Sequence, residues 1–189
     1  MEVPPGEFRA YLFDCDGTIA DSMPLHLKAW RQALARWGGE FPEELFYAYA
    51  GRPAETIVEL LNQHFGLKMP PRDVDRAREE NYRRLLPDIQ PVLEVKAYIE
   101  AGYGKVPMAV VSGSGRESVI ATLTHLKLLD RFDTLVGAED YEHGKPSPEP
   151  FLVAARRLGV EPKDCLVFED AELGFQSAAA AGMACAKVL

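Results

Sequence analysis

Five short apolar runs recur along this chain, and each is continuous instead of alternating with polar residues. A strand buried on both faces shows this pattern, whereas a strand with one solvated face alternates. Helical patterns separate the later runs, and strands that alternate with helices indicate an α/β fold with a parallel sheet. The expected strands are Ala10–Phe13, Met108–Val111, Thr134–Val136, Cys165–Phe168 and Cys185–Val188, and the expected helices between the later ones are Glu117–Leu126, Pro148–Leu158 and Ala171–Ala181.

The stretch from about Pro24 to Leu86 differs, because its pattern is helical throughout. Apolar side chains at helical spacing predict a first helix over Pro24–Trp37, which Gly38-Gly39 ends. An all-helical block inserted after the first strand of an α/β sheet is typical of a cap over an active site. We therefore expect a discontinuous core of residues 1–21 and 88–189 and a helical cap of residues 22–87. Three further cap helices are expected at Glu43–Ala50, Ala54–Phe65 and Arg72–Leu86, with a loop over Gly51–Pro53 between two of them.

Charge and composition exclude several classes of protein. The formal net charge of −8 disfavours a nucleic-acid partner, because such binding relies on basic patches. The apolar stretches are too short to span a bilayer, and the N-terminus does not resemble a signal peptide. The three cysteines show no CxxC spacing, so reduced thiols are expected. We expect a cytoplasmic protein without a membrane partner. The negative charge does not exclude a small phosphorylated metabolite as a ligand, because a few local cations and a metal can hold one.

Polar groups gather where the expected strands stop. The carboxyl ends of parallel strands meet at one edge of a sheet, and ligands bind there. This edge is therefore the candidate site. Its members are Asp14, Asp16 and Thr18 after the first run, Ser112 and Gly113 after the second, Glu169 and Asp170 at the end of the fourth, and Lys145 ahead of the helix near Pro148.

Each of these residues could also have a purely structural role. Asp-x-Asp-Gly commonly forms a turn, and Ser-Gly-Ser commonly forms a loop or a helix cap. A lysine such as Lys145 is commonly solvated, and Glu169-Asp170 before a helix can complement its dipole. Their joint occurrence, in order along the chain and beside the apolar runs, favours a single site.

The set suits phosphoryl transfer. Attack by a carboxylate on phosphorus forms an aspartyl-phosphate and divides one difficult step into two. Mg²⁺ and a lysine ammonium can neutralise the phosphate, and Mg²⁺ usually takes one or two carboxylates, here Asp14 and Asp170. Asp16 can protonate the leaving oxygen and then activate water. The groups suited to the remaining phosphate oxygens are Thr18, Ser112 and Gly113.

Four segments carry a resemblance to the haloacid dehalogenase (HAD) superfamily. YLFDCDGTIADS, VVSGS, HGKPSPEPF and VFEDAELGFQSAAAAGM look like its four signature motifs, and together they span nearly the whole chain. HLKAW in the first expected cap helix is similar to the β-phosphoglucomutase-like branch. Within it, the chain more closely resembles bacterial phosphatases of fructose 1-phosphate and related sugar phosphates. The resemblance implies a Rossmann-like, three-layer core, a mobile helical cap, Mg²⁺ as cofactor and a monomer.

The resemblance also implies roles for the acidic residues. Asp14 matches the nucleophile. Asp16 matches the general acid/base and a metal ligand through its backbone carbonyl. Asp170 matches a metal ligand, with Glu169 as a further ligand or as a partner of the ligands.

The remaining motif residues match phosphate-binding groups. Thr18 and Ser112 match the hydroxyls that hold the phosphate, with Gly113 beside them. Lys145 matches the lysine that steadies the nucleophile and the phosphate. In the cap, His26 matches a family histidine near the acid/base, and Arg52 is the candidate for the substrate's non-reacting end.

Phosphatase activity is favoured over mutase activity by two departures from the mutase pattern. Mutases of this branch carry a cap arginine where this chain has Ala54 or Glu55, and Lys-Asn where it has Gly115-Arg116. Arg52 and Arg116 remain candidate substitutes, so a β-phosphoglucomutase-type phosphohexomutase stays the alternative. Dehalogenases lack the aspartate that Asp16 supplies. A catalytically silent ligand-binding protein is the third possibility, because a fold does not fix a function.

Overall fold

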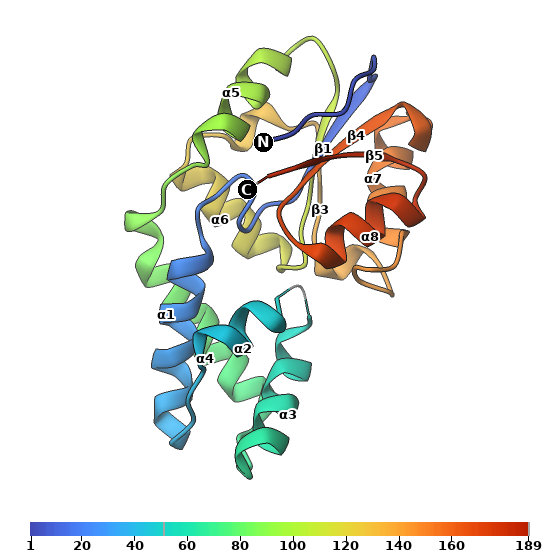
Figure 1. Cartoon of the computed structure of the whole chain (residues 1–189). Coiled ribbons are helices and arrows are strands. Elements are labelled where there is room, and N and C mark those ends of the chain that lie inside the picture. The colour runs from blue at the N-terminus through green and yellow to red at the C-terminus, as the bar shows by residue number, and fades with distance from the viewer. Residues whose placement is uncertain (51, 189) are drawn as a thin grey trace. The chain divides into compact units, whose positions relative to one another are not determined.

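The computed structural model describes residues 1–50 and 52–188, so Gly51, expected in a loop, lies outside the described residues. The chain divides into two compact units. The α/β unit comprises Met1–Asp21 and Gln90–Leu189, and the helical unit comprises Ser22–Ile89. All the named strands belong to the α/β unit (Figure 1).

The α/β unit is built on a five-stranded sheet in the order β3-β2-β1-β4-β5, with every neighbouring pair parallel. The central strand is therefore β1, flanked by β2 and β4. The expected fold class, an α/β protein with a parallel sheet, is confirmed. The strands are β1 (Ala10–Phe13), β2 (Met108–Val111), β3 (Thr134–Val136), β4 (Cys165–Glu169) and β5 (Ala184–Lys187).

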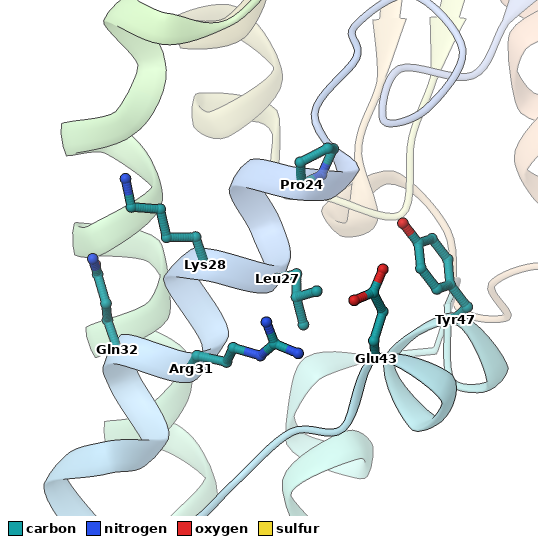
Figure 2. Close-up of a pocket in the computed structure, with 7 residues that line it drawn as sticks. All are labelled: Pro24, Leu27, Lys28, Arg31, Gln32, Glu43 and Tyr47. Atoms are coloured by element: carbon teal, nitrogen blue, oxygen red, sulfur yellow. The ribbon is translucent and has the colours of Figure 1, made fainter.

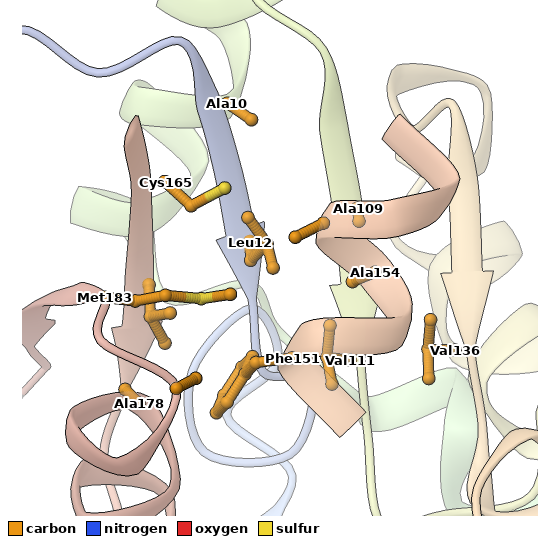
Figure 3. Close-up of a cluster of buried hydrophobic side chains, with 13 residues drawn as sticks. Ala10, Leu12, Ala109, Val111, Val136, Phe151, Ala154, Cys165, Ala178 and Met183 are labelled. Atoms are coloured by element: carbon orange, nitrogen blue, oxygen red, sulfur yellow. The ribbon is translucent and has the colours of Figure 1, made fainter. Parts of the chain in front are cut away.

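Helices cover both faces of the sheet, which gives three layers (Figure 1). On one face, α7 (Glu149–Leu158) and α8 (Glu172–Ala180) pack against buried side chains of the strands, such as Leu12 and Val111 (Figure 3). On the other face lie α5 (Leu93–Gly102) and α6 (Arg116–His125). Burial of both faces explains why the strands appear in the sequence as continuous apolar runs.

The helix α5 was missed by the sequence analysis. Its apolar signal is narrow, since only Val95 and Ile99, four residues apart, and Gly102 are buried. Gly102 packs closely against the sheet, because a Cβ there would lie 3.2 Å from the Tyr11 ring. The other expected elements of this unit are present with ends shifted by one residue at most.

The helical unit contains α1 (Met23–Leu34), α2 (Glu43–Ala48), α3 (Ala54–Phe65) and α4 (Pro71–Leu85). The first helix is shorter than expected, because a 3-10 turn, Ala35–Trp37, replaces its last residues before Gly38 ends it at φ 69°. A separate hydrophobic core holds the four helices together, with Trp30, Leu34, Phe41 and Leu61 among its members. The helical unit therefore has a core of its own.

Short 3-10 helices connect several elements. The remaining ones are Leu86–Asp88, Leu129–Arg131, Ala138–Asp140 and Pro162–Asp164. Among residues 1–50 and 52–188, no helix is both long and apolar enough to cross a membrane.

Candidate active site

A buried lysine joins the ends of three neighbouring strands. The Lys145 ammonium donates to Asp14 Oδ1 at 2.6 Å, to Glu169 Oε1 at 2.7 Å and to the Val111 carbonyl at 3.2 Å. Asp14 directly follows β1, and its backbone N–H donates to the Phe168 carbonyl of β4 at 2.9 Å. None of the three charged side chains is more than 10% exposed. Residues from distant parts of the chain thus form one charged cluster in the sheet's carboxyl edge.

Negative charge exceeds positive charge in this cluster. Burial raises the pKa of Asp14 well above its usual range, an effect that Lys145 opposes and the Glu169 and Asp170 carboxylates reinforce. Burial alone would lower the pKa of Lys145, but the charges of Asp14 and Glu169 raise it overall, so the ammonium stays charged. Burial and the Glu169 charge raise the pKa of Asp170 to about 6, although a hydrogen bond from Thr18 opposes this. Three carboxylates around one ammonium favour a further cation.

The carboxylates suit a magnesium ion. Asp14, Glu169 and Asp170 each offer an oxygen, and these atoms lie within 4.8 Å of one another. Mg²⁺ prefers oxygen ligands, so the chemistry of this donor set fits it. Asp170 Oδ1 accepts a hydrogen bond from Thr18 Oγ1 at 2.8 Å, which restricts the orientation of that carboxylate. The structure therefore brings the predicted metal ligands Asp14, Glu169 and Asp170 together.

Two glycines make room for the carboxylates. Gly17 has φ 90°, a conformation that favours glycine, and a Cβ there would overlap the Asp170 carboxylate. Gly174, in the first turn of α8, lies so close to the Glu169 carboxylate that a Cβ would overlap it as well. Gly174 was not among the predicted site residues, although a glycine inside a helix is an available signal of a close packing contact.

Glu169 uses both carboxylate oxygens within the protein. Oε1 accepts from Lys145, and Oε2 accepts from the backbone N–H groups of Asp170 at 2.8 Å and Ala171 at 3.0 Å. These amides lie at the start of α8, where N–H groups lack partners within the helix. Glu169 therefore fixes the start of α8 and the Lys145 ammonium at the same time.

We predict that Gly174→Ala weakens this arrangement. The added methyl group forces the Glu169 carboxylate away from Lys145 and from the α8 amides. We expect a loss of about 1–3 kcal/mol in the free energy of unfolding, and a smaller rise in melting temperature on adding Mg²⁺. Denaturant unfolding and thermal unfolding, with and without Mg²⁺, measure the two effects.

Gly144→Ala is the matched control, because a Cβ there would meet only the Tyr141 ring, at an ordinary 3.5 Å. This variant should resemble the wild type in both measurements. If Gly174→Ala matched the wild type as well, the contact between Gly174 and Glu169 would not constrain the site.

The loop after β2 contacts the predicted acid/base. Ser114 Oγ donates to Asp16 Oδ2 at 2.8 Å, while Ser112 Oγ lies 3.5 Å from the same oxygen. Ser112 is buried, and its carbonyl accepts from the Tyr141 hydroxyl at 3.1 Å. Gly113, between the two serines, is exposed. Ser114 was not among the predicted site residues.

Arg116 is held by an acidic partner. Its guanidinium pairs with Asp140 at 2.5 Å, and Arg157 pairs with the other oxygen of that carboxylate at 2.6 Å. Burial acts to raise the pKa of Asp140, but hydrogen bonds from Arg157, Gly137 and Arg116 lower it to about 2. Part of the Arg116 charge is thus already neutralised within the α/β unit.

The two predicted cap residues both lie in the helical unit. His26 is buried and stacks on the Tyr82 ring, with centroids 4.0 Å apart and planes 7° apart. Arg52 is exposed, and its guanidinium lies 5.8 Å from the centroid of the Tyr49 ring. Tyr82, whose ring limits how the His26 imidazole can turn, was not predicted from the sequence.

The helical unit also has an open pocket of about 370 Å³ between α1 and α2 (Figure 2). Neither His26 nor Arg52 lines it. In Figure 2 the Arg31 guanidinium and the Glu43 carboxylate point into the space between the two helices. The lining residues are Pro24, Leu27, Lys28, Arg31, Gln32, Glu43 and Tyr47.

Comparison with known proteins identifies the family. The model of the haloacid dehalogenase-like hydrolases matches residues 11–188. The chain belongs to this family. A curated relative, the fructose-1-phosphate phosphatase YqaB of Escherichia coli, is 39% identical over 178 residues, which cover 93% of this chain and 94% of the relative. The resemblance seen in the motifs is confirmed, and so is the expectation of an enzyme that is a phosphoric monoester hydrolase.

Solved structures support the same fold. The β-phosphoglucomutase of Clostridium difficile has a TM-score of 0.82 at 26% identity, covering 96% of this chain and 85% of that chain. CbbY of Rhodobacter sphaeroides, solved in complex with phosphate, has a TM-score of 0.86 at 24% identity, covering 96% of this chain and 87% of that chain. The expected Rossmann-like core of a HAD protein is thereby confirmed.

Proposed function

We propose that this protein is a Mg²⁺-dependent phosphatase that hydrolyses small sugar phosphates through an aspartyl-phosphate on Asp14. The observation that carries the proposal is the buried Asp14 carboxylate, held 2.6 Å from the Lys145 ammonium and two residues from Asp16. The similarity to a fructose-1-phosphate phosphatase supports the choice of substrate class.

The proposed reaction has two steps. An Asp14 oxygen attacks phosphorus, the bond from phosphorus to the sugar oxygen breaks, and Asp16 donates a proton to that oxygen. A water then attacks the phosphorus of the aspartyl-phosphate and gives a proton to Asp16, while the bond from phosphorus to the Asp14 oxygen breaks and inorganic phosphate leaves. Asp14 and Asp16 return to their starting states, so the net reaction is hydrolysis of one phosphate ester.

The remaining groups hold the charge of the phosphate. Lys145 is fixed by Glu169, so its ammonium is oriented before the substrate binds. Asp14, Asp170 and the Asp16 carbonyl would hold Mg²⁺, which when bound supplies positive charge beside the phosphate oxygens. Glu169 completes the acidic set, although its three hydrogen bonds favour a role in orienting Lys145. The proposed partners of the phosphate oxygens are Thr18, Ser112 and Gly113.

We further propose that the helical unit is a cap that closes over the substrate, with a core of residues 1–21 and 88–189 and a cap of residues 22–87. His26 and Arg52 are its proposed substrate contacts, together with Arg116 from the α/β unit. The proposal also includes a cytoplasmic monomer without a nucleic-acid or membrane partner. The acidic net charge of −8 supports the absence of a nucleic-acid partner.

Phosphate release from a panel of sugar phosphates tests the proposal. The panel contains fructose 1-phosphate, 6-phosphogluconate and β-glucose 1-phosphate, each with Mg²⁺ or with a chelator, and with or without glucose 1,6-bisphosphate. We expect Mg²⁺-dependent release of inorganic phosphate without the bisphosphate. Glucose 6-phosphate formed only with the bisphosphate would instead identify a mutase, and absence of any turnover would favour a binding protein.

A further inference from the structure

The proposed reaction gives no role to the contact between Ser114 and Asp16. Ser114 Oγ lies 2.8 Å from Asp16 Oδ2, which is an ordinary length for a hydrogen bond from a hydroxyl to a carboxylate. Ser112 Oγ lies 3.5 Å from the same oxygen, at the limit of a hydrogen bond. Of the two hydroxyls, that of Ser114 makes the stronger contact with Asp16.

The two serines are placed for different tasks. Ser112 Oγ accepts a hydrogen bond from the Ser114 backbone N–H at 3.0 Å, so its single proton is left to donate elsewhere. That donor suits a phosphate oxygen, the task proposed for Ser112. When Ser112 turns to phosphate, the long contact with Asp16 is lost, whereas the Ser114 contact can persist.

Both ends of the Ser114–Asp16 contact are anchored by backbone hydrogen bonds. Asp16 lies in a tight turn in which the Gly17 N–H donates to the Ala20 carbonyl at 2.8 Å and the Ala20 N–H donates to the Cys15 carbonyl at 2.9 Å. The Ser114 carbonyl accepts from the Ala138 N–H at 3.1 Å. With both backbones fixed, the hydroxyl of Ser114 limits rotation of the Asp16 carboxyl group.

We propose that Ser114 is a positioning residue that orients the Asp16 carboxyl group for proton transfer, a role that rests on the proposed function. A hydroxyl can donate to one oxygen of a carboxylate or to the carbonyl oxygen of a carboxylic acid. The same contact therefore serves the step in which Asp16 gives a proton and the step in which it takes one. Proton transfer requires close alignment, so a carboxyl group that rotates more freely is a poorer acid.

Leaving-group dependence in Ser114→Ala tests the inference. The kcat/KM value reports the steps up to and including attack by Asp14 and departure of the leaving group. A sugar alkoxide needs the proton from Asp16, whereas p-nitrophenolate departs without it. We expect kcat/KM to fall about tenfold for fructose 1-phosphate and to change less than about twofold for p-nitrophenyl phosphate. Ser114→Thr keeps the hydroxyl and should stay close to the wild type on both substrates.

A second measurement separates positioning from damage to the fold. If Ser114 acts through Asp16, adding Ser114→Ala to Asp16→Asn should produce no further loss of p-nitrophenyl phosphate or fructose 1-phosphate turnover. Thr124→Ala is the control. Among residues 1–50 and 52–188, the Thr124 hydroxyl donates only to the Ile120 carbonyl of its own helix. Equal losses on the two substrates, no loss on either, or additive effects with Asp16→Asn would overturn the inference. Failure of the wild type to hydrolyse either ester would instead overturn the proposed function.

Discussion

Replacing Asp14 by Asn is expected to lower kcat for phosphate release by on the order of 10⁴-fold or more, because an amide is not a competent nucleophile. The folded structure should survive, since Asn has the same shape and its carbonyl oxygen can still accept from Lys145. Removing one of three crowded carboxylates should leave the metal-free protein as stable as the wild type or more stable, as is common at functional sites. Phosphate release and thermal unfolding in a chelator measure the two effects.

Asp130→Asn is the matched control for this variant. Asp130 is an exposed carboxylate in an ion pair with Arg131, and it is not one of the candidate site residues. Its removal should change neither activity nor stability by a measurable amount, because exposed ion pairs contribute little. Retention of more than about one per cent of the wild-type kcat in Asp14→Asn would exclude the proposed nucleophile.

Lys145→Met is expected to produce the largest loss of stability. Methionine has a similar length but no charge, so Asp14 and Glu169 would remain buried without their cation. Removing one member of a buried ion pair typically costs about 3–5 kcal/mol, because the other charge is left uncompensated. The kcat should also fall by on the order of 10²-fold or more, since the ammonium no longer neutralises the phosphate. Denaturant unfolding and the phosphate assay measure these changes.

The double variant Asp14→Asn with Lys145→Met tests the cause of that loss. If uncompensated negative charge is responsible, removing the Asp14 charge should restore part of the lost stability, so the two effects will not add. Lys105→Met serves as the surface control, because Lys105 is exposed and pairs with no acid in the described part of the chain. Additive losses would attribute the effect of Lys145 to packing.

The strands of this protein were predictable because of where they lie. All four residues of β2 and all five of β4 are buried, and apart from the site residue Glu169 at the end of β4 they form continuous apolar runs. The helix α5 was not predictable in the same way, because a helix needs few buried side chains to be held against a sheet. Apolar residues at regular spacing reveal an element only where its side chains are buried, and few side chains of α5 are buried.

The residues that form the candidate site could be predicted more readily than the contacts between them. Topology alone brings Asp14, Ser112 and Glu169 to one edge, because parallel strands end there. The contacts depend on loop conformations that no local pattern encodes. The pairing of Arg116 with Asp140 and the hydrogen bond from Ser114 to Asp16 are two such cases. The roles of the site residues stay predictions until the variants are assayed.

The central position of β1 in the sheet affects how often the site opens. Its backbone amides are paired with β2 on one side and β4 on the other, so they can exchange with solvent deuterium only when the sheet itself opens. Asp14 directly follows this strand. It is therefore attached to a segment whose amides should be among the slowest to exchange in the α/β unit. Surface loops can open at a lower free-energy cost than the sheet, so the proposed attacking oxygen keeps its place while they do so.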